Sequence, residues 1–109
     1  MREETSITVR DETEHHRYVV EVDGVQAGLA VYHLRGGRHF FVHTEVDDDY
    51  AGQGVATALI REALEDVKAM GGTIVPMCPF VARYVRSHPE YNEMVDWEMV
   101  DRIGSGETT

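Results

Sequence analysis

Apolar and polar residues alternate through much of the N-terminal half of the chain, a period-two pattern that is typical of β-strands with one buried face. Turn residues separate the alternating runs, and the pairs Asp23-Gly24 and Gly36-Gly37 are typical of two-residue hairpin turns. The pattern therefore predicts a short first strand at residues 7–10. It also predicts an antiparallel meander of three strands at residues 17–22, 25–32 and 38–46.

The last strand of this meander carries candidate functional side chains. Because His43 and Glu45 are two residues apart, they are expected to share a face and to accept and relay a proton together. Two other interpretations are an exposed polar stripe and a histidine that hydrogen-bonds to the backbone. Strict alternation along the strand predicts two faces, one with Phe40, Val42, Thr44 and Val46 and the other with Phe41, His43 and Glu45.

The hydrophobic period changes after residue 50. Apolar residues at three- and four-residue steps predict an amphipathic helix over residues 54–70, ended by two glycines. A strand follows at 73–77, where Pro76 indicates a sheet edge or a bulge. Pro79 predicts a second helix that ends near residues 87–89, and residues 94–99 form a last amphipathic segment.

The order of these elements predicts an α+β fold. We expect a mostly antiparallel mixed sheet of about five strands with helices packed on it. A strand–helix–strand crossover at residues 38–77 should join parallel neighbours. The edge at residues 73–77 would allow a second copy to pair there, but the sequence does not decide the oligomeric state.

Composition narrows the class of protein and of partner. The 109 residues suffice for one domain, which we place at residues 1–103 with a flexible tail at 104–109. The 20 acidic residues against 10 Lys and Arg give a net charge of −10. This charge argues against nucleic acid or an anionic membrane as the partner and is compatible with a cationic amine.

Cysteine and histidine usage limits the metal chemistry and the disulfides. The single cysteine, Cys78, excludes an internal disulfide and a cysteine-rich zinc site, and no histidine–carboxylate spacing indicates a metal. No apolar run has the length of a membrane span, and the N-terminal residues do not resemble a signal peptide. We therefore expect a cytoplasmic protein that holds no metal.

The segment before the first helix brings two glycines to a helix N-terminus. Gly52, Gly54 and Ala56 have small side chains, which let an anion approach the backbone N–H groups that a helix leaves unpaired at its start. The N–H groups of residues 53–56 are therefore candidates for a phosphate site. An ordinary flexible helix entry fits the same pattern. The three aspartates at 47–49 must point outward for a phosphate to bind.

Four short motifs follow one another along the chain: His43-Thr44-Glu45-Val46, Gly52-Gln53-Gly54, Cys78-Pro79-Phe80-Val81 and His88-Pro89-Glu90-Tyr91. Together they resemble the GNAT N-acetyltransferase superfamily, and within it a branch of short, single-domain proteins. Residues 50–56 are similar to the acetyl-CoA signature Gln/Arg-x-x-Gly-x-Gly/Ala, with Gly54 and Ala56 at its last two fixed places. Ala51 stands where the family usually has Gln or Arg. The resemblance covers about residues 18–91.

The resemblance implies that acetyl-CoA is the cosubstrate and an amine the acceptor. The diphosphate would lie on the N–H groups of residues 53–57, and the pantetheine arm would pair with the end of the 38–46 strand as an added strand. Arg83 or Arg86 would meet the 3′-phosphate, and a backbone N–H near Val46 would stabilise the charge that develops on the thioester oxygen. The residues expected to bind the cofactor are Val46, Gly52, Gln53, Gly54, Val55, Ala56, Thr57 and Arg83.

Cys78 is a candidate for the chemistry itself. Because Pro79 suits the first helical position, Cys78 is expected to be the N-cap, where a helix favours the thiolate form. The sulfur could attack acetyl-CoA to form an acetyl-enzyme, could lie beside the thioester, or could be a small buried hydrophobe. Glu45, just ahead of the phosphate loop, is the preferred general base, with His43 beside it.

Two functions from different classes fit these features. The first is an N-acetyltransferase that moves an acetyl group to a small-molecule or protein amine by direct attack, with an acetyl-cysteine route as the variant. The second is a non-catalytic acyl-CoA-binding or protein-interaction module. It is favoured by the short polar link at residues 11–17, where larger family members carry helices that help to bind the acceptor. His88 is expected to be a structural cap, and Tyr91 to pack or to donate a hydrogen bond.

Overall fold

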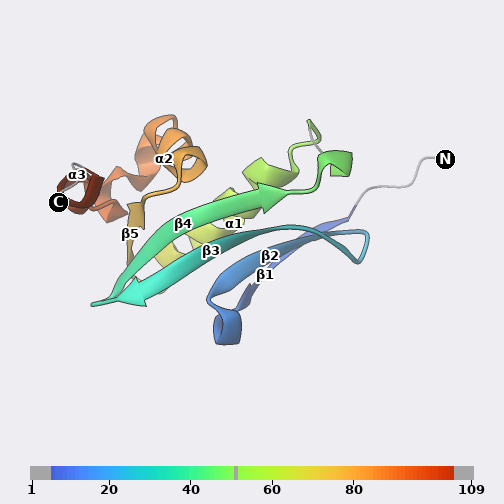
Figure 1. Ribbon diagram of the computed structural model, residues 1–109, viewed down its shortest axis with the longest axis horizontal. Coiled ribbons are helices and arrows are strands. Elements are labelled where there is room, and N and C mark those ends of the chain that lie inside the picture. The colour runs from blue at the N-terminus through green and yellow to red at the C-terminus, as the bar shows by residue number, and fades with distance from the viewer. Residues whose placement is uncertain (1–5, 51, 105–109) are drawn as a thin grey trace.

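The chain folds into one five-stranded mixed sheet. The computed structural model describes residues 6–50 and 52–104. The first four strands pair antiparallel and the last pair is parallel, which confirms the predicted α+β architecture and its crossover (Figure 1). The strands lie side by side in chain order, β1 (Ile7–Glu12), β2 (Arg17–Val22), β3 (Val25–Arg35), β4 (Arg38–Val46) and β5 (Thr73–Pro76).

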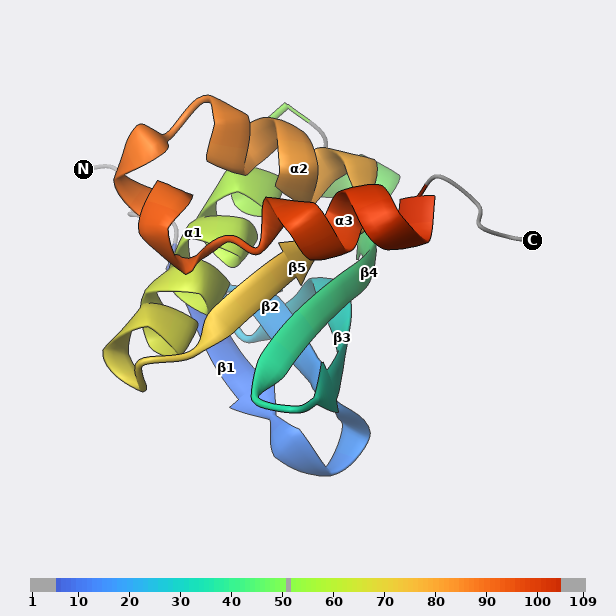
Figure 2. The ribbon, with the colours of Figure 1, turned by 90° about the vertical axis from the view of Figure 1, so that its left-hand side faces the viewer.

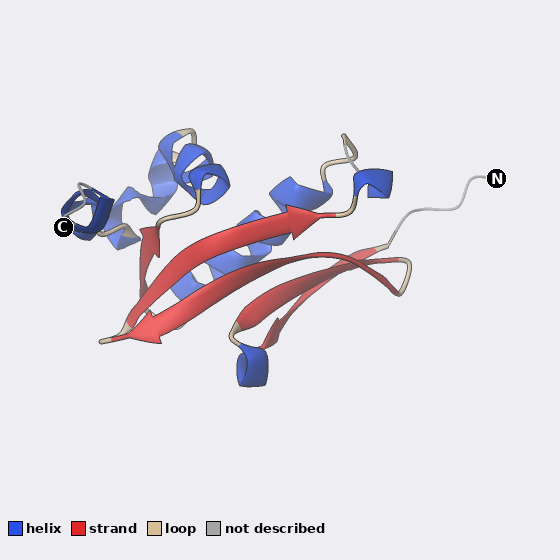
Figure 3. Cartoon of the chain, in the orientation of Figure 1, coloured by secondary structure: helices blue, strands red, loops and turns tan. Residues whose placement is uncertain are grey.

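The helices are unevenly placed around this sheet. α1 (Val55–Ala69) lies along one face, whereas α2 (Pro79–Arg86) and α3 (Trp97–Gly104) gather beside β5 (Figures 1, 2 and 3). Short 3-10 turns occupy Thr13–His15, Asp48–Tyr50 and Pro89–Met94. None of the helices in the described ranges is long and apolar enough to cross a membrane. The tail predicted at 104–109 lies outside the described residues except for Gly104, which ends α3.

The core lies between the sheet and α1. The apolar stripe of α1 is fully buried from Leu59 to Val67, and it packs against Tyr18 and Phe41 in one cluster. Tyr18 also donates its hydroxyl hydrogen to Asp66 of α1, with 2.7 Å between the oxygens. The sheet face that carries Tyr18 is therefore the covered face, and the opposite face is called here the outer face.

A β-bulge in β4 corrects the two faces that strict alternation predicts for this strand. Tyr32 of β3 pairs with Phe41 but Val31 pairs with His43, so Val42 is an extra residue between two paired positions. Thr44 pairs with Ala30, which pairs with Tyr18, so Thr44 lies on the covered face together with Phe41. The predicted grouping of Phe40 and Val42 with Thr44 and Val46 is therefore wrong. The predicted grouping of Phe41 with His43 and Glu45 is wrong for the same reason.

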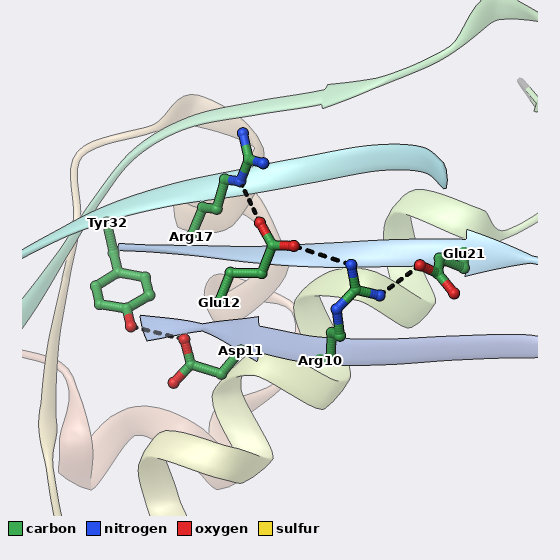
Figure 4. Close-up of polar contacts among 6 residues, drawn as sticks. All are labelled: Arg10, Asp11, Glu12, Arg17, Glu21 and Tyr32. Atoms are coloured by element: carbon green, nitrogen blue, oxygen red, sulfur yellow. Dashed lines mark hydrogen bonds and ion pairs between the residues drawn. The ribbon is translucent and has the colours of Figure 1, made fainter. Parts of the chain in front are cut away.

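Polar side chains tie β1 to β2 on the outer face and to β3 on the covered face (Figure 4). Glu12 accepts a hydrogen bond from Arg17 at 2.6 Å and another from Arg10 at 2.9 Å, and Arg10 also contacts Glu21. Figure 4 also shows the separate pair in which Tyr32 donates to Asp11 at 2.7 Å. Charged side chains along this edge strand disfavour pairing with another chain.

The edge at β5 is partly occupied by the C-terminal part of the chain. Val95 forms a parallel bridge with Ile74, and the N–H of Asp96 donates to the Ile74 carbonyl at 2.9 Å. Asp96 also pairs with Arg38 at 2.9 Å and caps α3 through the N–H of Met99. The sheet edge predicted to be free for a second copy is therefore covered at Ile74.

Candidate active site

The two parallel strands separate halfway along β4. Pairing between β4 and β5 runs from Arg38 with Thr73 to Phe41 with Pro76, and the N–H groups of both Met77 and Cys78 then converge on the Phe41 carbonyl, at 3.0 and 2.8 Å. Beyond this point β4 continues to Val46 with only β3 beside it in the described chain. An unpaired strand edge of this kind can accept an extended ligand as an added strand.

A cavity lies directly past the end of this unpaired edge. It has a volume of about 340 Å³, which is within the range of small-molecule sites. Its walls are formed by Val46, Tyr50, Gly52, Gly54, Val55, Ala56, Thr57 and Phe80. Six of the predicted cofactor-binding residues thus line one cavity, whereas Gln53 and Arg83 do not.

The backbone at this cavity exposes N–H groups at the start of α1. Gly54 is the N-cap of the helix and has a φ of +77°, a backbone conformation that residues with a Cβ rarely adopt. The first bond inside the helix joins the Ala58 N–H to the Gly54 carbonyl, so the N–H groups of residues 55–57 precede any helical acceptor. The N–H of Gln53 already donates to the Tyr50 carbonyl at 3.3 Å. The array open to an anion therefore begins after Gln53.

The charged residues near the cavity leave room for an anion to bind there. The aspartates at 47–49 are exposed, and none of them lines the cavity. Arg83 is exposed on α2, one turn after Phe80. Arg86 instead lies over the Trp97 ring, 4.6 Å from its centre. Of the two arginines considered for the 3′-phosphate, Arg83 is the one without a ring partner among the described residues. Ala51, the variable position of the signature, lies outside the described residues.

Cys78 occupies the position predicted for it, at the N-cap of α2 with Pro79 in the first turn. Its thiol is buried, 6% exposed, and lies 3.4 Å from the Oγ1 of Thr44, to which it donates. Both residues belong to the covered side of the sheet, where β4 has lost β5 as a neighbour. The contact between them was not anticipated, because it depends on the bulge that turns Thr44 to this side.

His43 and Glu45 lie on the outer face, away from Cys78. Their side chains are 56% and 62% exposed, and His43 Nε2 is 2.9 Å from Glu45 Oε2. The predicted shared face of these two residues is confirmed. The structure does not bring them together with Cys78, since β4 itself lies between the two groups. No cluster of His, Cys, Asp or Glu that could hold a metal ion is found within residues 6–50 and 52–104.

The sequence of the chain matches a known protein family. A family profile described as GCN5-related N-acetyl-transferase matches residues 17–94, well over half of the chain. The chain belongs to the GCN5-related N-acetyltransferase (GNAT) family. The resemblance inferred from the four sequence motifs is thus confirmed at the level of the superfamily. No curated protein sequence matches the chain.

Solved structures show the same GNAT fold. A GCN5-like protein from Staphylococcus aureus superposes with a TM-score of 0.63 at 16% identity, covering 82% of this chain and 87% of that one. The ribosomal-protein-S18-alanine N-acetyltransferase from Escherichia coli gives a TM-score of 0.52 at 20% identity. That match covers 59% of this chain and 43% of the E. coli enzyme, so this GNAT chain spans less than half of its length. At such identities the likeness concerns the fold.

The remaining motif of this GNAT chain is structural. His88 stacks on Tyr84, with 3.9 Å between ring centres, and its Nδ1 donates to the Tyr84 carbonyl at 2.7 Å. Tyr91 is 2% exposed and donates to Glu65 of α1 at 2.6 Å, and Lys68 lies over its ring. Tyr91 therefore both packs and donates, and together these contacts fasten the segment after α2 to α1.

Two wall residues of the cavity escaped the sequence interpretation. Phe80 and Tyr50 line it on the sides of α2 and of the turn before α1, yet neither was assigned a binding role. Their signal was present, since both belong to motif segments. The sequence does not assign them a binding role, because an aromatic residue on a helix or in a turn looks the same in sequence whether it packs or lines a cavity.

Proposed function

We propose that this protein binds acetyl-CoA and transfers its acetyl group to an amine. The observation that supports this best is the continuity of two features. The unpaired edge of β4 leads directly into the cavity at the N-terminus of α1, so that an extended arm and an anionic end can be held in series. Family membership supports acetyl transfer in general, and acetyl-CoA as donor is our inference from it.

Coenzyme A fits the donor groups that this site offers. The N–H groups of Gly54 and residues 55–57 would hold the diphosphate, and Gly52 would leave room for it. The edge of β4 up to Val46 would pair with the pantetheine arm. Phe80 would cover the site from the side of α2, and Arg83 would reach the 3′-phosphate.

Direct attack is the mechanism we favour. The nitrogen of a neutral amine forms a bond to the thioester carbonyl carbon, the carbon–sulfur bond breaks, and the sulfur leaves with the electron pair and takes up the proton that the nitrogen loses. An alkyl amine is protonated near neutral pH, so a base must first take its proton. The exposed pair of His43 and Glu45 is our candidate for that base, with Glu45 preferred. It serves an amine that arrives on the outer face.

The acetyl-enzyme route is the variant, and Cys78 is its nucleophile. The sulfur lies at the start of α2, in the gap between the strands, and is held by Thr44. In this route the acetyl group moves first to Cys78 and coenzyme A leaves. An amine then attacks the new thioester and releases the cysteine sulfur.

A non-catalytic acyl-CoA-binding module is the second candidate. The segment between β1 and β2 is favourable to it, since this segment holds only the 3-10 turn Thr13–His15 and offers no helical cover for an acceptor. A partner protein could then complete the site. The two functions differ in turnover. The acetyltransferase would acetylate a small amine or a protein amine, whereas the binding module would acetylate neither.

One experiment separates these functions. The protein is heated with and without coenzyme A, and release of free thiol from acetyl-CoA is then followed with a panel of amines for the wild type, Cys78→Ala and Glu45→Gln. We expect stabilisation by coenzyme A, amine-dependent thiol release and a loss of rate in Glu45→Gln. Stabilisation without turnover would favour the binding module, and no stabilisation would remove both proposals.

A further inference from the structure

A second cavity opens on the outer face of the sheet, at the point where β4 and β5 separate. Its volume is about 380 Å³. Its walls are formed by His33 and Arg35 of β3, Phe40 and Val42 of β4, Met77 after β5, and Ile103 of α3. Two of these, Val42 and Ile103, are large apolar side chains left 39% and 45% exposed. Apolar side chains that share one cavity and remain in water are typical of a binding site.

This cavity adjoins the proposed reaction centre through short stretches of backbone. Met77 is followed directly by Cys78, and Val42 is two residues from Thr44, the hydrogen-bond partner of Cys78. The same bulge that turns Thr44 to the covered side leaves Val42 in the outer cavity. A molecule held here would therefore meet the gap between the strands from the side opposite to Cys78.

The two residues proposed to take the proton from the amine lie on the same outer face. His43 and Glu45 follow Val42 along β4, and both side chains are more than half exposed. An amino group bound over Val42 would come near this pair without crossing the sheet. The position of the cavity thus agrees with the direction from which a proton could be removed.

The charge at this cavity identifies the kind of acceptor. Arg10, Arg17 and Arg38 each pair with a carboxylate. Arg35 lines the cavity and makes no ion pair within the described part of the chain, although the protein carries 20 acidic residues. A guanidinium beside an apolar cavity is suited to bind a carboxylate through charge-assisted hydrogen bonds.

Building on the proposed function, we propose that this outer cavity binds the acyl acceptor, a small amine with an apolar body and a carboxylate. Hydrophobic α-amino acids have this chemistry. The apolar body would pack against Phe40 and Ile103, and the carboxylate would bind Arg35, with His33 beside it. The amino group would face the gap between β4 and β5. The pair of His43 and Glu45 takes one proton from the ammonium group. The nitrogen then bonds to the acetyl carbon as the carbon–sulfur bond breaks, and the leaving sulfur takes the second proton from the nitrogen.

The test measures kcat/KM with acetyl-CoA as donor for L-phenylalanine, L-leucine and L-methionine, for their carboxamides, and for spermidine. We expect each amino acid to exceed its carboxamide by about tenfold, the usual weight of one hydrogen bond between charged groups. Arg35→Ala should abolish this preference through KM and leave the carboxamides unchanged. Arg61→Ala, which removes an exposed arginine of α1, is the matched control and should keep the preference.

Failure of this inference is distinguishable from failure of the proposed function. Turnover of spermidine with no preference for a carboxylate, or a preference that survives in Arg35→Ala, would overturn the inference and leave acetyl transfer standing. If no amine is turned over, binding of N-acetyl-L-phenylalanine to the protein saturated with coenzyme A is measured by calorimetry. Binding that Arg35→Ala weakens about tenfold supports the cavity assignment, and absence of binding to the wild type overturns it.

Discussion

The thiol of Cys78 lies 3.4 Å from the hydroxyl oxygen of Thr44, across the gap that opens where β5 leaves β4. Neither strand alone creates this relationship. It needs the bulge at Val42, which turns Thr44 to the covered side, and it needs Pro79 to begin α2 directly after Cys78. The two residues mark the point at which the donor and the acceptor are proposed to meet.

Substitution of Cys78 distinguishes the two chemical routes. If the acetyl group passes through the cysteine, Cys78→Ala abolishes turnover, and mass spectrometry of the wild type with acetyl-CoA alone detects an acetyl group on Cys78. If attack is direct, as we favour, Cys78→Ala retains most of the rate and no acetyl-enzyme forms. Thr44→Val, nearly isosteric, is the control: it removes the contact to the thiol but keeps the sulfur.

The conformation of Gly54 gives a prediction with a matched control. Gly54 and Gly24 have φ values of +77° and +84°, and a Cβ added at either would meet no atom within 4 Å. Alanine at either position should therefore cost about 1 kcal/mol of stability through backbone strain alone. Of these two, only Gly54 lines the cavity proposed to bind coenzyme A, so only Gly54→Ala should also weaken coenzyme A binding, by about tenfold. Calorimetric titration of both variants checks this, and equal affinities would contradict it.

Two buried tyrosines predict loss of stability at alkaline pH. Burial raises the pKa of Tyr18 and of Tyr32, and hydrogen bonds to Asp66 and Asp11 raise them further. In the unfolded chain these hydroxyls ionise near pH 10. Above that pH the unfolded state loses protons that the folded state keeps, so the free energy of unfolding falls as the pH rises.

The variants Tyr18→Phe and Tyr32→Phe test the alkaline behaviour. At pH 7 each loses one hydrogen bond to a carboxylate and should be less stable by about 1–2 kcal/mol. Between pH 9.5 and 11 each should lose less stability than the wild type, as measured by urea unfolding. A pH dependence equal to that of the wild type in both variants would show that these hydroxyls are not protected by the fold.

The buried His39 should make the free energy of unfolding fall as the pH is lowered, which is the opposite of the effect of the two tyrosines. Burial lowers the pKa of His39, against the raising effect of the Asp11 and Asp66 carboxylates, and its Nδ1 has no hydrogen-bond partner in the part of the chain that the structure describes. The folded state therefore holds the neutral ring, while the unfolded state gains a proton as the pH falls below about 6.5. Stability due to this residue is present above that pH and is lost below it. His39→Phe should reduce the loss between pH 7 and 5.5.

Much of this fold follows from hydrophobic patterning, and the exceptions have physical causes. Alternation predicted β2, β3 and β4, since one face of each strand is buried by α1. Alternation did not predict the bulge at Val42, because an extra residue in a strand leaves no mark in the polarity of its neighbours. The cover over Ile74 was missed as well, since it depends on where the chain returns after α2 and not on local pattern.

The site was predictable where backbone chemistry defines it and not where side chains meet. Small residues at 52–56 predicted accessible backbone N–H groups at the start of α1, because glycine conformation and helix termini are local properties. The contact of Cys78 with Thr44 and the separation of Cys78 from Glu45 depend on which face of β4 each residue takes. One misplaced residue in the register reverses that assignment.

The proposed function depends most on the backbone N–H groups at the start of α1 as the anchor of coenzyme A. Titration of the ¹⁵N-labelled protein with coenzyme A, followed through amide chemical shifts, tests this residue by residue. We predict saturable shifts that are largest at Gly54 and residues 55–57, with smaller shifts along the unpaired edge of β4 and none in the β2–β3 turn at Gly24. Unchanged amides at residues 54–57 in the presence of saturating coenzyme A would contradict it.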